Sequence, residues 1–337
     1  MIGHRVVAID GVLDPIAWTT GRQGQHDVPF STRLRSDQGA MSALKEFFRL
    51  CDAGEDCAFA PNAARRYKAL AERLITRAIY TEDPETGEIR RFRYQDLISF
   101  SLGAMYDSAS WPEFAEFLAA IEAEANATRL GTGLARLKQV IGVGRSQDRA
   151  FPERPEYPNF VEGFPGVACS DSDDPDSYKR WTEAGASAAE VFGYFGRLWT
   201  WASSICANWP GRDDDRYAGP FDRMTNRPVL VVGTKFDPAT RYQGALIAHD
   251  LLPNSALLTV HGWAHGAIFL STCADQVMAA YLIHRTTPAE GTVCEQDVVP
   301  FAGSEAAALT PAAASRQAAS RFLRGRLLPQ VVIRSLD

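Results

Sequence analysis

A strand–helix–strand pattern in the carboxyl-terminal third of the chain restricts its fold more than any other feature. Residues 228–233 (PVLVVG) and 256–260 (ALLTV) are short apolar runs rich in β-branched side chains, which is typical of strands buried on both faces. Between them, residues 242–251 place apolar side chains at helical spacing, and Thr240 is expected to cap this helix. Two strands joined by a crossover helix predict a parallel sheet covered by helices.

A third strand of the same kind is predicted near the amino-terminal end, at residues 5–9 (RVVAI), and Asp10 and Gly11 follow it directly. One strand is not stable by itself, so we expect residues 5–9 to join the later sheet although more than 200 residues lie between them. The predicted fold class is therefore α/β, with a long segment inserted between two parts of one parallel sheet.

The inserted segment, from about residue 36 to residue 208, is predicted to be mostly helical. Apolar side chains at helical spacing predict a helix that Asn62 could cap and that includes Tyr67 and Leu74. Further helices are expected at residues 92–107 and after Ser110.

Two parts of the insertion near residue 176 have different compositions. Residues 176–206 are rich in aromatic side chains and are expected to be helical, whereas residues 151–176 contain five prolines and many acidic residues and are expected to form a loop.

The composition limits the possible partners. The chain has 337 residues, enough for two domains or for one large domain with an insertion. It has no stretch of 18 uncharged apolar residues, so we expect neither a membrane-spanning helix nor a membrane partner. With 35 basic and 41 acidic residues, the net charge of −6 argues against nucleic acid as a partner.

The cysteines raise the question of the cellular compartment. Six are spread along the chain without a Cys-x-x-Cys pair: Cys51, Cys57, Cys169, Cys206, Cys273 and Cys294. Zinc sites usually place two thiolates on one short turn, so a metal site is not expected. Disulfides are a better explanation and would indicate an exported protein, because cytosolic thiols are kept reduced. The start of the chain (MIGHRVVAIDGVLDP) lacks the pattern of a signal peptide, so either the cysteines are free or an export signal has been lost.

Two ionisable residues directly follow the two later strands. Asp237 lies four residues after Gly233, and His265 lies five residues after Val260. Reactive groups gather at the carboxyl ends of strands in open parallel sheets. A carboxylate and a histidine there are the orienting acid and the base of a serine hydrolase triad, in which imidazole accepts the serine proton and the carboxylate fixes the tautomer of the ring.

Each of these signals by itself has a simpler structural explanation. An Asp-Pro pair in a loop is commonly a turn former. His261 and His265 could each be histidines with only a structural role in a loop or in the core. The two signals on consecutive strand ends of one strand–helix–strand unit favour the catalytic interpretation.

Three segments of the chain resemble one known family. The segment RPVLVVGTKFDPATRYQGALIAHDLLPNSALLTVHGWAHGAIFLSTC and its continuation to Cys294 resemble the C-terminal domain of the tripeptidyl aminopeptidase-like (TAP-like) α/β-hydrolases, which are secreted serine exopeptidases related to proline iminopeptidases. The start, RVVAIDGVLDPIAWTTG, is similar to the strand and loop that follow the nucleophile helix in that family. ICANWPGRDDDRYAGPF is similar to the segment that joins cap and C-terminal domain.

The resemblance implies a partial α/β-hydrolase sheet with a large helical cap insertion. It divides the chain into a strand and loop (1–35), the helical cap (36–215), the TAP-like hydrolase subdomain (216–300) and a peripheral tail rich in alanine and arginine (301–337).

The same resemblance assigns roles to single residues. It implies that Asp237 is the acid and His265 the base of the triad, with no cofactor. It also implies three disulfides, which pair Cys51 with Cys57, Cys169 with Cys206, and Cys273 with Cys294.

The nucleophile of such a triad is not recognisable in this sequence. A nucleophile elbow requires Gly-x-Ser-x-Gly after a strand. Ser146 (GRSQD) and Ser187 (GASAA) come nearest, but neither has both glycines. Family members carry the elbow and the oxyanion loop before the strand that corresponds to residues 5–9, so we expect the N-terminal part of the hydrolase to be missing and this chain alone to be inactive.

The expected function is that of the C-terminal part of a secreted or cell-wall-associated serine exopeptidase that acts on peptides with a free N-terminus. Glu113, Glu116, Glu183 and Glu190 are cap acids that could bind the substrate ammonium group, although each is more simply a solvated surface residue. Two alternatives stay open: an esterase-type α/β-hydrolase, and a non-catalytic relic or split-enzyme subunit that acts as a binding module, possibly with the missing half as its partner.

Overall fold

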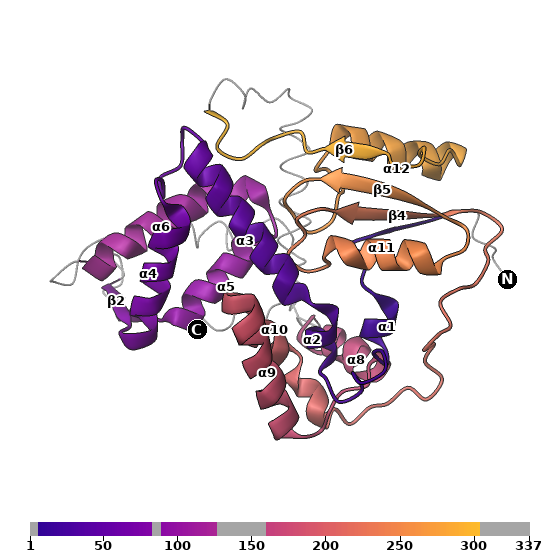
Figure 1. Ribbon diagram of the computed structural model, residues 1–337, viewed down its shortest axis with the longest axis horizontal. Coiled ribbons are helices and arrows are strands. Elements are labelled where there is room, and N and C mark those ends of the chain that lie inside the picture. The colour runs from indigo at the N-terminus through magenta and orange to yellow at the C-terminus, as the bar shows by residue number, and fades with distance from the viewer. Residues whose placement is uncertain (1–5, 83–88, 127–159, 304–337) are drawn as a thin grey trace, which may run out of the picture. The chain divides into compact units, whose positions relative to one another are not determined.

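The computed structural model describes residues 6–82, 89–126 and 160–303 (Figure 1). These residues divide into two compact units. One contains the described residues of Met1–Ala43 and Pro158–Asp297, and the other contains those of Leu44–Tyr157 and Val298–Asp337. The four-part division predicted from the sequence stays a prediction, and its tail after residue 303 lies outside the described residues.

The first unit contains the sheet that the sequence predicts. Its strands are Val7–Asp10 (β1), Val229–Thr234 (β4), Ser255–His261 (β5) and Val293–Glu295 (β6). Its helices are Pro15–Trp18 (α1), Phe30–Leu34 (α2), Phe160–Asp171 (α8), Tyr178–Phe192 (α9), Gly196–Ala202 (α10), Tyr242–Leu251 (α11) and Thr272–His284 (α12), with short 3-10 turns at Gly193–Phe195 (η3) and Ser204–Asn208 (η4).

Within the described residues, the four strands form one parallel sheet in the order β1-β4-β5-β6. The predicted pairing of the first strand with the later sheet is confirmed, because Val7 lies opposite Val229 and Asp10 opposite Val232. The first and last residues of each predicted strand lie within two positions of those observed. The short strand β6 was not predicted, since its three residues carry too little apolar periodicity to be recognised.

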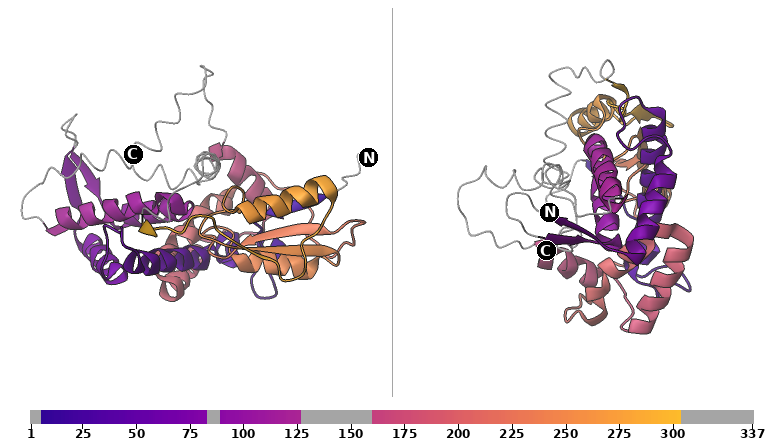
Figure 2. Two further views of the ribbon diagram at one scale, coloured as in Figure 1. Left: turned by 90° about the horizontal axis from the view of Figure 1, so that it is seen from above. Right: turned by 90° about the vertical axis from the view of Figure 1, so that its left-hand side faces the viewer.

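The two faces of the sheet are buried by different helices, as Figures 1 and 2 show. Val229 and Val231 point to the face covered by α11, whereas Leu230 and Val232 belong to the core cluster on the α12 face. Strand β4 is buried at every position, which explains its continuous apolar run. Gly244 lets α11 approach the loop after β1, because a Cβ there would lie 2.3 Å from the carbonyl oxygen of Val12.

The proline-rich segment differs from its sequence prediction. Residues 151–176 were expected to form a loop, but α8 occupies Phe160–Asp171 with Pro165 inside the helix, while residues 151–159 lie outside the described residues. Tertiary contacts outweigh the cost of a proline, which is about 3 kcal/mol in a helix interior. On α8, Ala168 packs into an apolar cluster with α1 and α2, and Cys169 forms a disulfide with Cys206.

The aromatic segment after α8 is helical as predicted but is not continuous. It contains α9 and α10, and Gly193 between them adopts a positive φ of 62°, which a residue with a side chain rarely does.

The second unit is mostly helical and also contains one hairpin. Its elements are Ala63–Thr76 (α4), Ile79–Glu82 (β2), Ile89–Phe92 (β3), Tyr94–Met105 (α5), Ser108–Ser110 (η1) and Trp111–Asn126 (α6), and Ser36–Ala53 (α3) runs into it from the first unit. The ring of Phe47 lies at its core, with centroids 5.6 Å from Trp111 and 5.0 Å from Phe114. The antiparallel β2–β3 hairpin was not predicted.

The predicted cap of α4 is only partly correct. Asn62 occupies the position before the helix, but its side chain makes no capping bond; instead, Asp52 Oδ1 accepts the N–H of Ala63 at 3.0 Å. In the part of the chain that the structure describes, no helix is both long and apolar enough to cross a lipid bilayer.

Candidate active site

The loops after β4 and β5 bring the two predicted catalytic residues together. Because both strands end at the same edge of the parallel sheet, Asp237 and His265 meet there. His265 Nδ1 lies 3.0 Å from Oδ2 and 3.1 Å from Oδ1 of Asp237. The side chain of Asp237 is 1% exposed and that of His265 is 17% exposed. The carboxylate is thus buried while the imidazole keeps limited access to solvent.

Asp237 is held by donors from two loops. Its Oδ1 accepts the N–H groups of Ala239 at 2.8 Å and Thr240 at 2.7 Å. Its Oδ2 accepts the Thr240 hydroxyl at 2.8 Å and the N–H of Gly266 at 3.0 Å. The carboxylate is therefore fixed in position before any substrate arrives.

The role expected for Thr240 was wrong. Helix α11 begins at Tyr242 with Arg241 in the capping position, and Thr240 lies one residue earlier. Its hydroxyl instead donates to Asp237 and lies 3.3 Å from His265 Nδ1. Thr240 is therefore part of the site, which sequence reasoning missed because a threonine before an apolar periodic run also matches a helix cap.

The surroundings of Asp237 keep it ionised. Burial acts to raise the pKa of its carboxyl group, but the charge and hydrogen bond of His265 and the N–H groups of Gly266 and Thr240 hold the pKa below its usual value. An ionised carboxylate accepts the Nδ1 proton of a neutral imidazole and leaves Nε2 with the lone pair. This is the tautomer that a general base requires.

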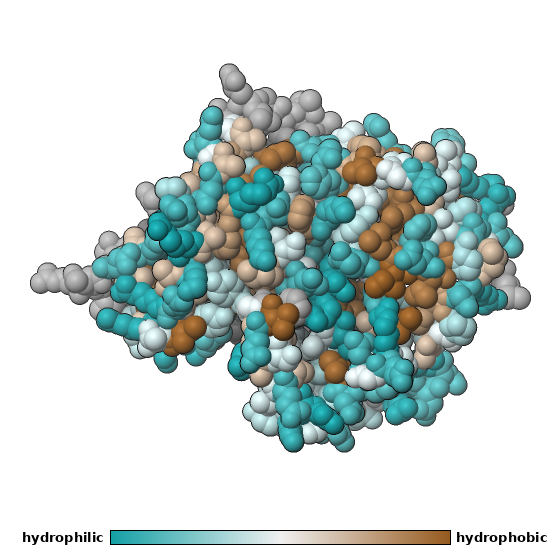
Figure 3. All heavy atoms as spheres, in the orientation of Figure 1, coloured by the Kyte–Doolittle hydropathy of each residue, from teal (hydrophilic) through white to brown (hydrophobic). Residues whose placement is uncertain are grey.

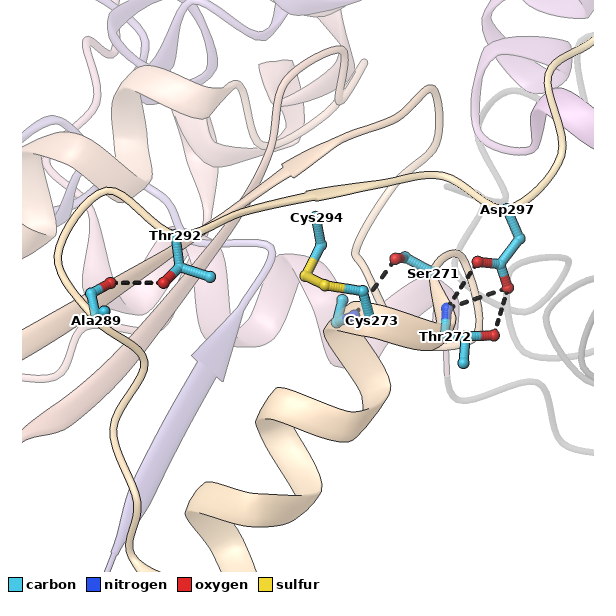
Figure 4. Close-up of a disulfide and its surroundings, with 8 residues drawn as sticks. Ser271, Thr272, Cys273, Ala289, Thr292, Cys294 and Asp297 are labelled. Atoms are coloured by element: carbon cyan, nitrogen blue, oxygen red, sulfur yellow. Dashed lines mark hydrogen bonds between the residues drawn. A yellow bond between two sulfur atoms is a disulfide. The ribbon is translucent and has the colours of Figure 1, made fainter.

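The helix after the histidine loop is anchored to the sheet by covalent and polar contacts (Figure 4). Cys273 in the first turn of α12 forms a disulfide with Cys294 on β6. Asp297 accepts the N–H of Thr272 at 2.9 Å, and Ser271 accepts the N–H of Ala274 at 3.3 Å. These contacts hold the first turn of α12 and join it to β6 and the residues after it.

All three disulfides that the family resemblance implied are confirmed. Besides the Cys273–Cys294 bond, the structure contains the bonds Cys51–Cys57 and Cys169–Cys206. Disulfides persist in oxidising surroundings, so they indicate a protein of the cell envelope or the extracellular space.

Two of the other predicted candidates, His261 and Glu183, form surface pairs. His261 Nδ1 lies 2.7 Å from Oε2 of Glu295 on β6, and both side chains are exposed. Glu183 pairs on the surface with Lys179 and Arg180. The described residues contain no group of three or more histidine, cysteine, aspartate or glutamate side chains that could hold a metal ion.

Comparison with protein families identifies the region that contains this site. Residues 190–294 match the model of a family described as TAP-like protein. The matched range includes Asp237, His265 and the Cys273–Cys294 disulfide. The resemblance to the TAP-like α/β-hydrolases and the predicted α/β class are therefore confirmed.

Three similar proteins have the names of hydrolases. The chain is 25% identical over 300 residues to carboxylesterase B of Mycobacterium tuberculosis (86% of this chain, 52% of that protein) and 26% identical over 306 residues to serine protease Hip1 of the same organism (86% and 53%). It is 23% identical over 304 residues to tripeptidyl aminopeptidase of Streptomyces lividans (88% and 51%). The chain spans about half the length of each of these relatives and is related to hydrolases, one of which is named a serine protease.

Proposed function

We propose that this chain supplies the acid and the base of a secreted serine hydrolase, with Asp237 as the acid and His265 as the base. The observation that carries the proposal is the buried, ionised carboxylate of Asp237, whose oxygens lie 3.0 and 3.1 Å from His265 Nδ1. The relationship to named serine hydrolases supports it.

The mechanism follows from this geometry. His265 Nε2 accepts the proton of a serine hydroxyl while the serine oxygen attacks the carbonyl carbon of the substrate. The imidazolium that forms is stabilised by Asp237, and it then returns the proton to the leaving group. Water repeats the sequence on the acyl-enzyme, with His265 again as the base, and releases the acid product.

The serine in this proposal comes from a second segment of the hydrolase. The sequence of this chain contains no Gly-x-Ser-x-Gly, so we expect the chain alone to be inactive. The open side of β1 is a suitable place for the second segment, because β1 is at the edge of the described sheet and Val7 on it is 42% exposed. Figure 3 shows further hydrophobic residues at the surface over α11 and the neighbouring strands.

We propose a peptide with a free N-terminus as the substrate and exopeptidase action as the reaction. The name of the Streptomyces relative, tripeptidyl aminopeptidase, supports this choice. The helical segment between β1 and β4 would act as a cap that restricts access to the site, which favours short peptides over chain interiors. The three disulfides favour a location outside the cytoplasm, in the cell wall or the medium.

An esterase is the second candidate, since the same chain is 25% identical to a protein named carboxylesterase B. The two functions share the acid, the base and the acyl-enzyme, so only the substrate distinguishes them.

One experiment separates the candidates. The chain is assayed alone and when fused to the part of the Streptomyces relative that it does not match, with tripeptidyl amides, aminoacyl amides and short-chain esters as substrates. We expect no labelling of the chain alone by a fluorophosphonate probe, and hydrolysis of the peptide amides by the fusion. Turnover of esters only would favour the esterase. A correctly folded fusion that labels with the probe but turns over neither class would favour a binding module.

A further inference from the structure

The last residue of β1, Asp10, lies next to the candidate active site although it is 255 positions away from His265 in the sequence. It is opposite Val232 in the register of the sheet, so its side chain is at the same strand-end edge as the loops after β4 and β5. Its Oδ1 accepts the N–H of Gly11 at 2.8 Å, and its Oδ2 accepts the N–H of Ala267 at 2.7 Å. The mechanism above does not use this carboxylate.

Two carboxylates, one at the end of β1 and one in the loop after β4, hold consecutive amides of the histidine loop. Asp237 Oδ2 accepts the N–H of Gly266 at 3.0 Å, and Asp10 Oδ2 accepts the next N–H, that of Ala267. Gly266 adopts a positive φ of 76°, and a Cβ on it would lie 3.4 Å from Asp10 Oδ2. The loop therefore turns tightly between the two acids directly after His265.

The backbone that follows Asp10 also borders the imidazole ring. A Cβ on Gly11 would lie 3.4 Å from His265 Cε1 and 3.4 Å from the Thr240 hydroxyl, and Gly11 has a positive φ of 65°. The end of β1 thus forms one side of the space that the ring occupies.

The charge of Asp10 acts on the same group of residues. Burial raises the pKa of the Asp10 carboxyl group; the N–H groups of Ala267 and Gly11 and the charge of His265 lower it, while the charge of Asp237 raises it. Asp10 is therefore close enough to both members of the pair to interact with them electrostatically. A second negative charge near the ring favours its protonated form.

We infer that Asp10 is a positioning residue, which fixes the loop carrying His265 through the N–H of Ala267 and stabilises the imidazolium with a second carboxylate. This inference rests on the proposed role of Asp237 and His265. Asp237 holds the ring by a direct hydrogen bond, and Asp10 acts on it through the loop and through its charge.

The test measures the pKa of His265 by NMR in the full-length chain, without any need for activity. The variant His265→Gln identifies the imidazole signal. Asp10→Asn removes the charge and keeps one acceptor oxygen, for which the N–H groups of Ala267 and Gly11 compete. We therefore expect the pKa of His265 to fall by about 0.5 to 1 pH unit, and the Ala267 amide to exchange more slowly than in Asp10→Ala. Asp10→Ala removes the charge and both acceptor oxygens. The pKa of His265 should therefore fall, and hydrogen exchange of the Ala267 amide should become at least tenfold faster.

The matched control is Asp297→Asn. Asp297 also accepts a backbone N–H in this unit, that of Thr272 at the start of α12, whereas Asp10 accepts the N–H of Ala267, two residues after His265. The pKa of His265 should be unchanged in this variant. If Asp10→Asn leaves the pKa of His265 as it is in the parent chain, or if Asp297→Asn lowers it equally, the inference is wrong.

The variant Asp237→Asn separates this inference from the proposed function. If Asp237→Asn lowers the pKa of His265 and Asp10→Asn does not, only the role of Asp10 is refuted. If neither substitution lowers it, the acid–base pair itself is refuted. Should Asp10→Ala fail to fold, Asp10→Asn alone decides the question, because its side chain has nearly the same shape.

Discussion

Two histidines four positions apart each pair with a carboxylate: His261 at the end of β5, and His265 in the loop that follows. His261 Nδ1 lies 2.7 Å from Glu295 Oε2, which is closer than His265 Nδ1 to either oxygen of Asp237, at 3.0 and 3.1 Å. The closer pair is the more exposed one: its side chains are 43% and 72% exposed, against 17% and 1% for the pair of His265 and Asp237.

The comparison shows that distance alone does not distinguish the candidate site from a surface pair. Glu295 is surrounded by solvent, so its attraction to His261 is screened and both side chains can move apart. Asp237 is buried and accepts bonds from Ala239, Thr240 and Gly266, so its position and charge do not depend on His265 alone. Burial and the number of donors distinguish the candidate site from the surface pair.

The largest expected difference between the pairs is in catalysis. In the fused enzyme described above, Asp237→Asn should lower kcat by a factor on the order of 10⁴, because the amide no longer fixes the reactive tautomer of His265. Glu295→Gln, the matched change in the surface pair, should leave kcat within about twofold. Steady-state kinetics on the preferred substrate measures both values, and similar losses in the two variants would remove the distinction.

Removing the Cys273–Cys294 disulfide should change the surroundings of His261 in the surface pair more than those of His265 in the candidate site. It joins two cysteines 21 positions apart and holds β6, which carries Glu295. Replacing both cysteines by serine should lower the free energy of unfolding by about 3 kcal/mol, because the unfolded chain is no longer constrained. Urea denaturation measures this loss, and NMR should show His261 changed and His265 largely unchanged.

A control for the disulfide prediction is the Cys51–Cys57 bond, which joins cysteines only 6 positions apart in the second unit. Its replacement by serines should cost less, about 2 kcal/mol, since it closes a shorter loop. An equal or larger cost for this pair would show that loop length does not govern the effect here.

The half-buried carboxylate of Asp174 differs from that of Asp237 because no histidine compensates its charge. Burial raises the pKa of Asp174 to about 6, although the N–H of Phe30 and the charge of Arg33 oppose the shift. Its folded pKa is above the unfolded value of 3.8, so the native state binds the proton more tightly, and stability falls as pH rises from about 4 through 6. Asp174→Asn should therefore stabilise the protein by about 1–2 kcal/mol at pH 7.5 and by little at pH 4.5.

Urea denaturation at the two pH values checks the Asp174 prediction. At each pH, the free energy of unfolding of Asp174→Asn is compared with that of the parent chain. We expect the increase to be larger at pH 7.5 than at pH 4.5. An equal increase in the free energy of unfolding at both pH values would mean that the charge of Asp174 does not cause the stabilisation.

The smallest expected effect is that of the surface pair on stability. Glu295→Gln should change the free energy of unfolding by no more than about 0.5 kcal/mol, because exposed ion pairs contribute little and are screened by salt. A double-mutant cycle with His261→Gln measures the coupling energy. A coupling above about 1 kcal/mol that persists at high salt would contradict the view that solvent exposure weakens this pair.

Much of the site could be predicted because its signals are local. Asp237 and His265 each follow a strand whose apolar run is visible in the sequence, and parallel strands place their carboxyl ends at one edge. Thr240 and Asp10 were not predicted as parts of the site. Asp10 also follows a predicted strand, so the same rule could have found it, whereas the hydroxyl of Thr240 had two possible roles that only the bonds to Asp237 distinguish.

The amino-acid sequence by itself determined the parallel sheet and the position of the acid and the histidine, because β-branched runs and helical spacing are properties of neighbouring residues. The tertiary structure alone decided that α8 is a helix in spite of Pro165, that β6 joins the sheet, and that Asp10 reaches the N–H of Ala267. These features depend on contacts between residues far apart in the chain. Local sequence patterns give no information about the free energy of such contacts.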